Sequence, residues 1–175
     1  MATAPAAPRT FRLFIALWPE DALRGEIASW QSSWVSPERA APVKPERLHM
    51  TLHFIGNVDG HRLPALAAGL QVPFEPITLD LGFGEVWPNG VAVLRPAATP
   101  APLQQLHAAL AQKLLALELP VEDRPFKPHV TLARRAFGAR APVEGPRLHW
   151  QADQGYVLVR SLPGGAGYQV LNRFA

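Results

Sequence analysis

Two segments of this sequence carry the same pattern, a histidine followed two positions later by a threonine. Residues 49–52 read HMTL and residues 129–132 read HVTL, so the second copy begins 80 residues after the first. In both copies polar residues alternate with apolar ones, which is the period of a β-strand with one buried face. Each copy would therefore present one imidazole and one hydroxyl on one face of a strand, and two apolar side chains on the other.

The two copies predict a catalytic site if their strands lie side by side about a pseudo-twofold axis. His49 and His129 would supply a general acid and a general base, and Thr51 and Thr131 would supply hydroxyl donors. This set suits displacement at a phosphodiester, because the donors can hold the nonbridging oxygens while the imidazoles move protons. Since the ordinary pKa of histidine is about 6.5, one ring can be neutral and the other charged near neutral pH. The chemistry requires no metal ion and no cofactor.

The surrounding residues predict the elements that would position these motifs. Apolar or alternating runs predict strands, and apolar residues at spacings of three and four predict helices. Strands are expected at residues 11–17, 48–54, 77–81, 91–94, 125–132, 156–162 and 168–174, and helices at 20–34, 60–70 and 103–117. Alternation in the second strand would place Phe54 on its buried face, and residues 134–147 read as a long surface loop. This mixture of helices and antiparallel hairpins favours an α+β fold.

Length and composition indicate a folded protein outside the membrane. The chain has 175 residues, 48% of them hydrophobic and 18% charged, which is enough for one domain or two small lobes with a sizeable core. No apolar run approaches the roughly 20 residues that a membrane-spanning helix needs. Residues 1–10 lack the features of a secretory signal, and the absence of cysteine excludes disulfides and thiolate metal sites. We therefore expect a cytoplasmic monomer without a membrane partner.

Charge is distributed unevenly along the chain. Residues 1–123 contain 9 Lys and Arg against 12 Asp and Glu, whereas residues 124–175 contain 8 against 2. Most of these cations are arginines, which favour bidentate contact with phosphate. The basic final third therefore indicates a polyanionic partner, although a bias toward Ala, Pro and Arg in the composition could produce the same charge without such a partner.

The doubled motif and its flanking residues resemble a known family. The opening RLFIAL at residues 12–17 followed by Pro19, the run LHMTLHFIG at 48–56 and the run PHVTLAR at 128–134 are similar to the two-histidine phosphoesterases. Within these, the sequence resembles the bacterial and archaeal RNA 2′,3′-cyclic phosphodiesterases, formerly called 2′–5′ RNA ligases. The resemblance covers nearly the whole chain in order.

This resemblance implies a fold and an activity. The expected fold is a single bilobal α+β domain over residues 1–175, with two antiparallel sheets, outer helices and a central cleft about a pseudo-twofold axis. The expected reaction opens a terminal 2′,3′-cyclic phosphate on RNA to a 2′-phosphate, with reversible 2′–5′ joining as a side activity. The implied partner is RNA with a cyclic phosphate end.

The resemblance also implies roles for individual residues. His49 would give a proton to the leaving 3′ oxygen, and His129 would accept the proton of the attacking water. Thr51 and Thr131 would bind phosphate oxygens. Arg134 occupies the family position after the second motif where an arginine usually faces the phosphate, with a solvated loop arginine as the alternative. Phe14 could stack on a base near the cleft, or be a core aromatic, and the loop 134–147 could contact the RNA backbone.

Other readings stay open from the sequence alone. A noncatalytic RNA-binding module could use the basic final third and the histidines as phosphate donors. A cyclic phosphodiesterase acting on small nucleotides or 2′–5′ oligoadenylates would keep the chemistry and change the substrate. A zinc site at His49 and His53 is not expected, because residues four apart in a strand are about 13 Å apart. His61, His107 and His149 are expected to cap, pack or lie at the surface.

Overall fold

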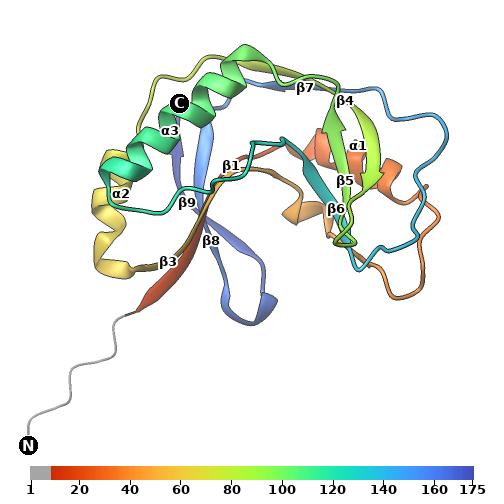
Figure 1. Cartoon of the computed structure of the whole chain (residues 1–175), viewed down its shortest axis with the longest axis horizontal. Helices are drawn as coiled ribbons and strands as arrows, with labels where there is room; N and C mark the ends of the chain where they lie inside the picture. Colours follow the sequence, from red (N-terminus) through yellow and green to blue (C-terminus); the bar gives the residue numbers. More distant parts are fainter. Residues whose placement is uncertain (1–8) are drawn as a thin grey trace, which may run out of the picture.

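Figure 1 shows the computed structural model, which describes residues 9–175. Its nine strands form one antiparallel sheet in the order β7-β4-β5-β6-β3-β1-β8-β9, with β2 beside β6. The expectation for the N-terminal segment falls mainly on residues 1–8, which lie outside the described residues. No helix within residues 9–175 is long and apolar enough to cross a bilayer.

The predicted strands and helices are all present, with shifted ends. The strands are β1 (Thr10–Leu17), β2 (Ala41–Pro42), β3 (Met50–Asp59), β4 (Ile77–Val86), β5 (Ala92–Pro96), β6 (Val130–Arg134), β7 (Leu148–Ala152), β8 (Tyr156–Ser161) and β9 (Tyr168–Phe174). The helices are α1 (Asp21–Gln31), α2 (Leu63–Gly69) and α3 (Ala101–Ala116). β6 begins later than predicted, because Pro125 and Pro128 have no N–H to give to a neighbouring strand. β2 and β7 were not expected.

The helices bury their apolar stripes in one large core that they share with the sheet. α3 buries Leu103, Leu106, Leu110 and Leu114, as the spacing of three and four predicts. α1 buries Leu23 and Ile27 in the same core. Figure 1 shows α2 and α3 beside the half of the sheet that contains β3, β8 and β9, and α1 behind β4, β5 and β6. The chain therefore crosses between the halves directly after β1.

A row of fully buried residues crosses the centre of the sheet. Leu17 on β1 pairs with Met50 on β3, Met50 pairs with Val130 on β6, and Val130 pairs with Leu94 on β5. All four side chains are 0% exposed. This row anchors the residues that directly precede Met50 and Val130, which are the two motif histidines.

The two expected sheets are joined into one. Met50 and Val130 form the single register pair between β3 and β6 among the described residues. The halves are therefore continuous through the backbone hydrogen bonds of the motif strands themselves. This corrects the expectation of two separate sheets, while the α+β class and the antiparallel pairing are confirmed.

A bulge in β3 changes which residues face the core. Ala16 pairs with Thr51, and Ile15, the residue before it in β1, pairs with His53. Leu52 is therefore an extra residue in β3. Past the bulge the alternation is inverted, and Phe54 is 37% exposed instead of buried. The expectation for Phe54 was therefore wrong, because strict alternation does not anticipate an inserted residue. A second register shift follows, next to Gly56, whose φ is +90°.

The loop after β6 packs mostly away from the centre of the molecule. Val35 and Arg140 exchange backbone hydrogen bonds of 3.0 and 2.8 Å, and Ala136 and Ala139 are buried. After this loop β7 adds to the far edge of β4. The loop is thus fixed against the connection that follows α1, and within it only Arg134 reaches the cleft described below.

Candidate active site

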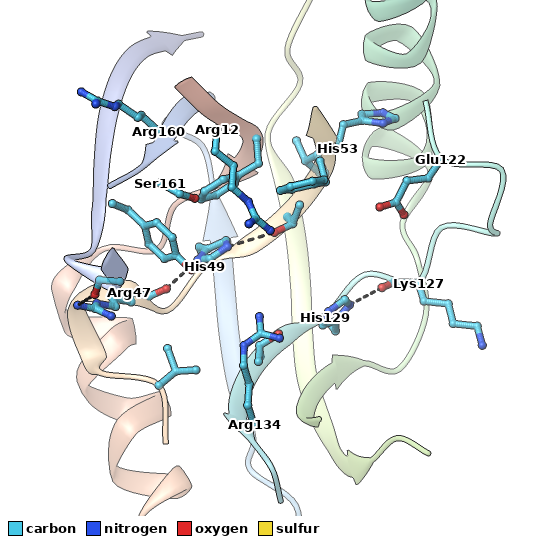
Figure 2. A pocket seen from close by; sticks show the side chains of 18 of the residues that line it. Arg12, Arg47, His49, His53, Glu122, Lys127, His129, Arg134, Arg160 and Ser161 are labelled. Atoms are coloured by element: carbon cyan, nitrogen blue, oxygen red, sulfur yellow. Dashed lines mark hydrogen bonds between the residues drawn. The ribbon is translucent and has the colours of Figure 1, made fainter. Parts of the chain in front are cut away.

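A large cavity contains both sequence motifs. Its volume is about 1210 Å³, and His49, Thr51, His129 and Thr131 all line it. In the pairing frame of Met50 and Val130, His49 lies across from Thr131, and Thr51 across from His129. Figure 2 shows the two imidazoles reaching the same space from opposite sides. The predicted pseudo-twofold arrangement of the two motifs is therefore present.

Both histidines are held in the same way by the backbone two residues earlier. Nδ1 of His49 lies 2.7 Å from the carbonyl oxygen of Arg47, and Nδ1 of His129 lies 2.7 Å from that of Lys127. A carbonyl can only accept, so each Nδ1 carries the proton and donates it. The unprotonated Nε2 of each neutral ring is then left for chemistry in the cleft. Nε2 of His49 lies 3.1 Å from Oγ1 of Thr51, whose hydroxyl can donate to it.

More aromatic side chains surround His49 than His129. The Trp18 indole stacks on the His49 imidazole at 5.3 Å and 14°, and the Phe14 ring stacks on it at 4.9 Å and 30°. The Tyr168 ring meets His49 edge-on at 5.2 Å. His129 has one aromatic neighbour among the described residues, Trp87, at 4.4 Å. The two otherwise matching motifs therefore sit in different surroundings.

Burial and nearby cations lower the pKa of both histidines. For His49, burial and then the charges of His129, Arg134 and Arg24 lower the pKa to about 4, although the hydrogen bond to the Arg47 carbonyl opposes this. For His129, burial and then the charges of Arg95 and Arg134 lower the pKa. Both imidazoles are consequently neutral at pH 7 in the free protein.

Arg134 and Phe14 both line the cavity. Arg134 ends β6, is exposed, and its side chain reaches toward the space between the two histidines (Figure 2). Its charge acts on the pKa of both, which places it close to each. Phe14 is 4% exposed, so it is mostly a packed aromatic, yet its edge lines the cavity and its ring supports His49.

The cavity is strongly cationic. Six basic side chains line it against one acidic side chain, Glu122: they are Arg12, Arg47, Arg124, Lys127, Arg134 and Arg160. Four of the six come from the basic final third of the chain. The uneven charge noted in the sequence is therefore concentrated in part at the cleft, which suits an anionic ligand.

Several residues that contact the two histidines or their cavity were not anticipated. Trp18 and Trp87 stack on or meet the histidines, and Arg47 supplies the carbonyl for His49 while its guanidinium donates to Gly165 O at 3.0 Å. The position of Trp18 could have been predicted from the sequence, because Trp18 continues the alternation of Phe14 and Ala16. These residues lie on the face of β1 opposite to the main core. Trp87 precedes the turn between β4 and β5, and nothing in its local sequence indicates a contact with His129.

The remaining histidines take structural places. His53 is 5% exposed, its Nε2 lies 2.8 Å from the carbonyl oxygen of His107, and the two rings stack at 4.0 Å. His107 also stacks on Phe126, and burial followed by the charge of His53 lowers its pKa to about 4. His149 pairs with Asp80 on an exposed strand face at 2.9 Å. Across residues 9–175, no three His, Asp or Glu side chains form a group that could hold a metal ion.

Comparison with known proteins gives consistent matches over most of the chain. A family model described as the 2′-5′ RNA ligase superfamily matches residues 19–157. A Thermus thermophilus protein named RNA 2′,3′-cyclic phosphodiesterase is 35% identical over 179 residues, which cover 94% of this chain and 89% of that protein. An Escherichia coli protein of the same name is 32% identical over 142 residues, covering 79% and 80%.

Solved structures agree with the sequence matches. The crystal structure of Escherichia coli LigT complexed with 3′-AMP has a TM-score of 0.84 and 28% identity, covering 94% of this chain and 97% of that one. A crystal structure described as a phosphoesterase has a TM-score of 0.84 and 27% identity, with the same coverage. Since the family model spans most of the chain and the doubled motif lies within one cleft, this protein belongs to the 2′-5′ RNA ligase superfamily.

Proposed function

We propose that this protein is an RNA 2′,3′-cyclic phosphodiesterase that opens a terminal cyclic phosphate to a 2′-phosphate. The observation that carries the proposal is the placement of two imidazoles, each with its Nδ1 proton held by a carbonyl, in one cationic cavity. An acid–base pair and fixed cations match the needs of a phosphodiester displacement. The names of the Thermus thermophilus and Escherichia coli relatives support the same reaction.

The reaction requires two proton transfers around one phosphorus atom. His129 takes a proton from a water molecule, whose oxygen forms a new bond to phosphorus. The bond between phosphorus and the 3′ oxygen breaks, and His49 gives its proton to that oxygen. The product carries a 3′ hydroxyl and a 2′-phosphate, and the two histidines have exchanged protonation states. Solvent returns both to their starting states.

A lowered pKa has to be reconciled with the role of proton donor. His49 with a pKa of about 4 is neutral in the free protein at pH 7, so it cannot donate from Nε2. A bound phosphodiester carries a negative charge, and an opposite charge close to an imidazole raises its pKa. The Arg47 carbonyl favours the protonated ring as well. Bound substrate therefore raises the pKa of His49, so that this ring is protonated and can donate. The His129 ring, which activates water, remains neutral.

The remaining cleft residues have binding roles in this proposal. Thr51 and Thr131 donate their hydroxyls to the nonbridging oxygens, for which Thr51 gives up its contact with Nε2 of His49. Arg134 stabilises the charge that grows on those oxygens in the transition state. Phe14 keeps the His49 ring in place and presents an edge to the terminal nucleotide. None of these steps uses a metal ion.

The proposal extends to a second nucleophile in the same step and to the setting in which the step occurs. Attack of the 5′ hydroxyl of another RNA on phosphorus, in place of water, would break the bond to the 3′ oxygen and join the two RNA ends through a 2′–5′ bond with the same acid–base pair. We also propose a monomer acting in the cytoplasm, as the composition indicates.

The test is incubation of the metal-free protein with a short RNA that ends in a 2′,3′-cyclic phosphate. We expect a 2′-phosphate product, identified by phosphorus NMR against authentic 2′- and 3′-phosphate standards. Binding without turnover would instead favour a noncatalytic RNA-binding module. Faster turnover of cyclic mononucleotides or of 2′–5′ oligoadenylates than of RNA would move the activity to small substrates.

A further inference from the structure

The bulge in β3 builds a second feature into the cleft, the Arg12–Phe54 pair. Past the bulge Phe54 turns from the core to the cavity, and its ring is 37% exposed. The Arg12 guanidinium lies over this ring, with 4.9 Å between Cζ and the ring centroid. Bulges beside active sites commonly re-aim a side chain in this way. The pair is thus positioned by the same irregularity that interrupts the strand of the first motif.

Arg12 holds a cation in the cavity that no protein group neutralises. Its side chain is exposed, and within residues 9–175 it forms neither a hydrogen bond nor an ion pair. Figure 2 shows it directed from β1 toward His49. Stacking on Phe54 limits the orientations of the guanidinium and leaves its N–H groups free to donate. An arginine held in this way suits a phosphate group.

The position of Arg12 is displaced from the reacting centre along β1. Arg12 pairs with Asn57, whereas Ala16 pairs with Thr51 of the motif. Four residues of strand correspond to about 13 Å between Cα atoms. The Arg12 guanidinium therefore lies next to the position of the reacting phosphate, and not at it, even though the side chain points back toward His49. Arg134 already approaches the space between the two histidines from the other side (Figure 2). The two arginines therefore serve different positions.

The cavity has room for more than the reacting nucleotide. Its volume of about 1210 Å³ is above the roughly 300–1,000 Å³ that is usual for small-ligand pockets. Around Arg12 the lining is polar or aromatic and includes no carboxylate, whereas Glu122 lies toward the opposite end (Figure 2). Charge therefore favours a second phosphate at the Arg12 end.

We propose that the Arg12–Phe54 pair binds the phosphodiester on the 5′ side of the reacting nucleotide, so that the preferred substrate is an oligonucleotide of at least two residues. This inference rests on the proposed function, because it assumes that the cyclic phosphate lies between His49 and His129. Arg12 contacts the nonreacting backbone of the substrate and acts on binding. Its removal is expected to raise KM and to leave kcat nearly unchanged.

The experiment compares two dinucleotides that both end in a 2′,3′-cyclic phosphate. One has an ordinary internal phosphodiester, and the other has an uncharged methylphosphonate there. For the wild-type protein we expect kcat/KM to be about tenfold higher with the charged linkage, as a charge-assisted contact would give. For Arg12→Met the two substrates should be hydrolysed with nearly equal kcat/KM, because the cation that senses the linkage is absent.

Two further variants separate this contact from general effects. Arg173→Met removes an exposed arginine that is not part of the cavity lining and whose guanidinium donates to the carbonyl oxygen of Gln154 at 3.2 Å. This variant should keep the tenfold preference, because it removes one positive charge, as Arg12→Met does, but removes no contact with the substrate backbone. Phe54→Leu should reduce the preference while keeping the charge, because the guanidinium loses the ring that orients it.

The outcomes distinguish the subsite from the proposed function. Equal hydrolysis of both dinucleotides by the wild-type protein would overturn the subsite and leave the cyclic phosphodiesterase activity intact. Retention of the full preference in Arg12→Met, or its loss in Arg173→Met, would overturn it as well. Hydrolysis of neither dinucleotide by the wild-type protein would overturn the proposed function and the subsite together.

Discussion

Met50 pairs with Val130 across the centre of the sheet, and each of these residues directly follows a motif histidine. The pair lies on the pseudo-twofold axis of the cleft, because antiparallel pairing places each histidine across from the threonine of the other motif. Both side chains are 0% exposed, so the contact that joins the halves is also part of the core. The two motif imidazoles are thereby fixed relative to each other by the backbone of β3 and β6.

This geometry predicts that the two histidines act in one step. His49→Ala and His129→Ala should each lower kcat on a cyclic-phosphate RNA by about 10²–10⁴, the loss typical of removing a positioned acid or base. The double variant should lose far less than the product of the two single losses. Steady-state kinetics of the three variants measures this, with circular dichroism as the control for folding. Near-normal kcat in either single variant would contradict the assignment.

The same donor set predicts that chelators do not stop the reaction. In the proposed mechanism the two imidazoles supply both proton transfers, and Arg134 with the threonine hydroxyls supplies charge stabilisation, so no Lewis acid is needed. We expect the rate to be unchanged after dialysis against excess EDTA, with the metal content checked by mass spectrometry. Loss of activity that a divalent ion restores would show that the mechanism is wrong.

Patterns within single strands and helices could be predicted from the sequence. The leucine stripe of α3 and the alternation of both motifs are local signals, and each motif repeats the other, so their placement near one another followed from a symmetry argument. The direct pairing of Met50 with Val130 did not follow, because the sequence gives no register between distant strands. It is this register that merges the two expected sheets into one.

Features that depend on distant contacts or on inserted residues escaped prediction. Phe54 continues a perfect alternation in the sequence, yet the extra residue near His53 turns it into the cleft. The different surroundings of two nearly identical motifs come from Trp18, Tyr168 and Trp87, which lie far from the motifs in the chain. Local sequence therefore indicates the two motifs, and contacts with distant residues determine their surroundings.

A buried hydroxyl far from the cleft offers a test of the fold without a change in the chemistry. Tyr156 is 0% exposed, donates to the Leu70 carbonyl at 2.7 Å and accepts from the Val72 N–H at 2.9 Å. Tyr156→Phe leaves both backbone groups without this partner and should lower the free energy of unfolding by about 1–3 kcal/mol. Urea unfolding measures this, and kcat should not change. An unaltered midpoint would mean that water replaces the hydroxyl.

The lowered histidine pKa values predict an acidic optimum for the free protein. The reactive state needs one imidazole protonated and the other neutral, and both pKa values lie below the ordinary value near 6.5. As pH rises above the higher of the two, the protonated partner is lost, and kcat/KM should fall about tenfold per pH unit. kcat should decline at a higher pH, because bound substrate raises the pKa of the donor.

A variant of Arg134 tests the cause of this shift. The Arg134 charge lowers the pKa of both histidines, so Arg134→Met should move the kcat/KM profile to higher pH as well as lowering its maximum. Profiles from pH 4 to 9 with a fixed ionic strength measure the two effects separately. A lowered maximum with no displacement along the pH axis would mean that Arg134 binds substrate without acting on the histidines.

The last prediction separates the proton donor from the base by changing the leaving group. A phenolate of low pKa departs without a proton, so loss of the donor should matter much less for an aryl phosphodiester than for a ribose 3′ oxygen, whereas loss of the base should slow both. With His49 as donor, His49→Ala should regain most of its activity on the aryl ester, and His129→Ala should not. The ratio of the two rates for each variant is the measurement, which cancels general damage to the site. Recovery of His129→Ala alone would reverse the roles. That result would also fit the deeper burial of His49 and its pKa of about 4, which favour a neutral ring that accepts a proton.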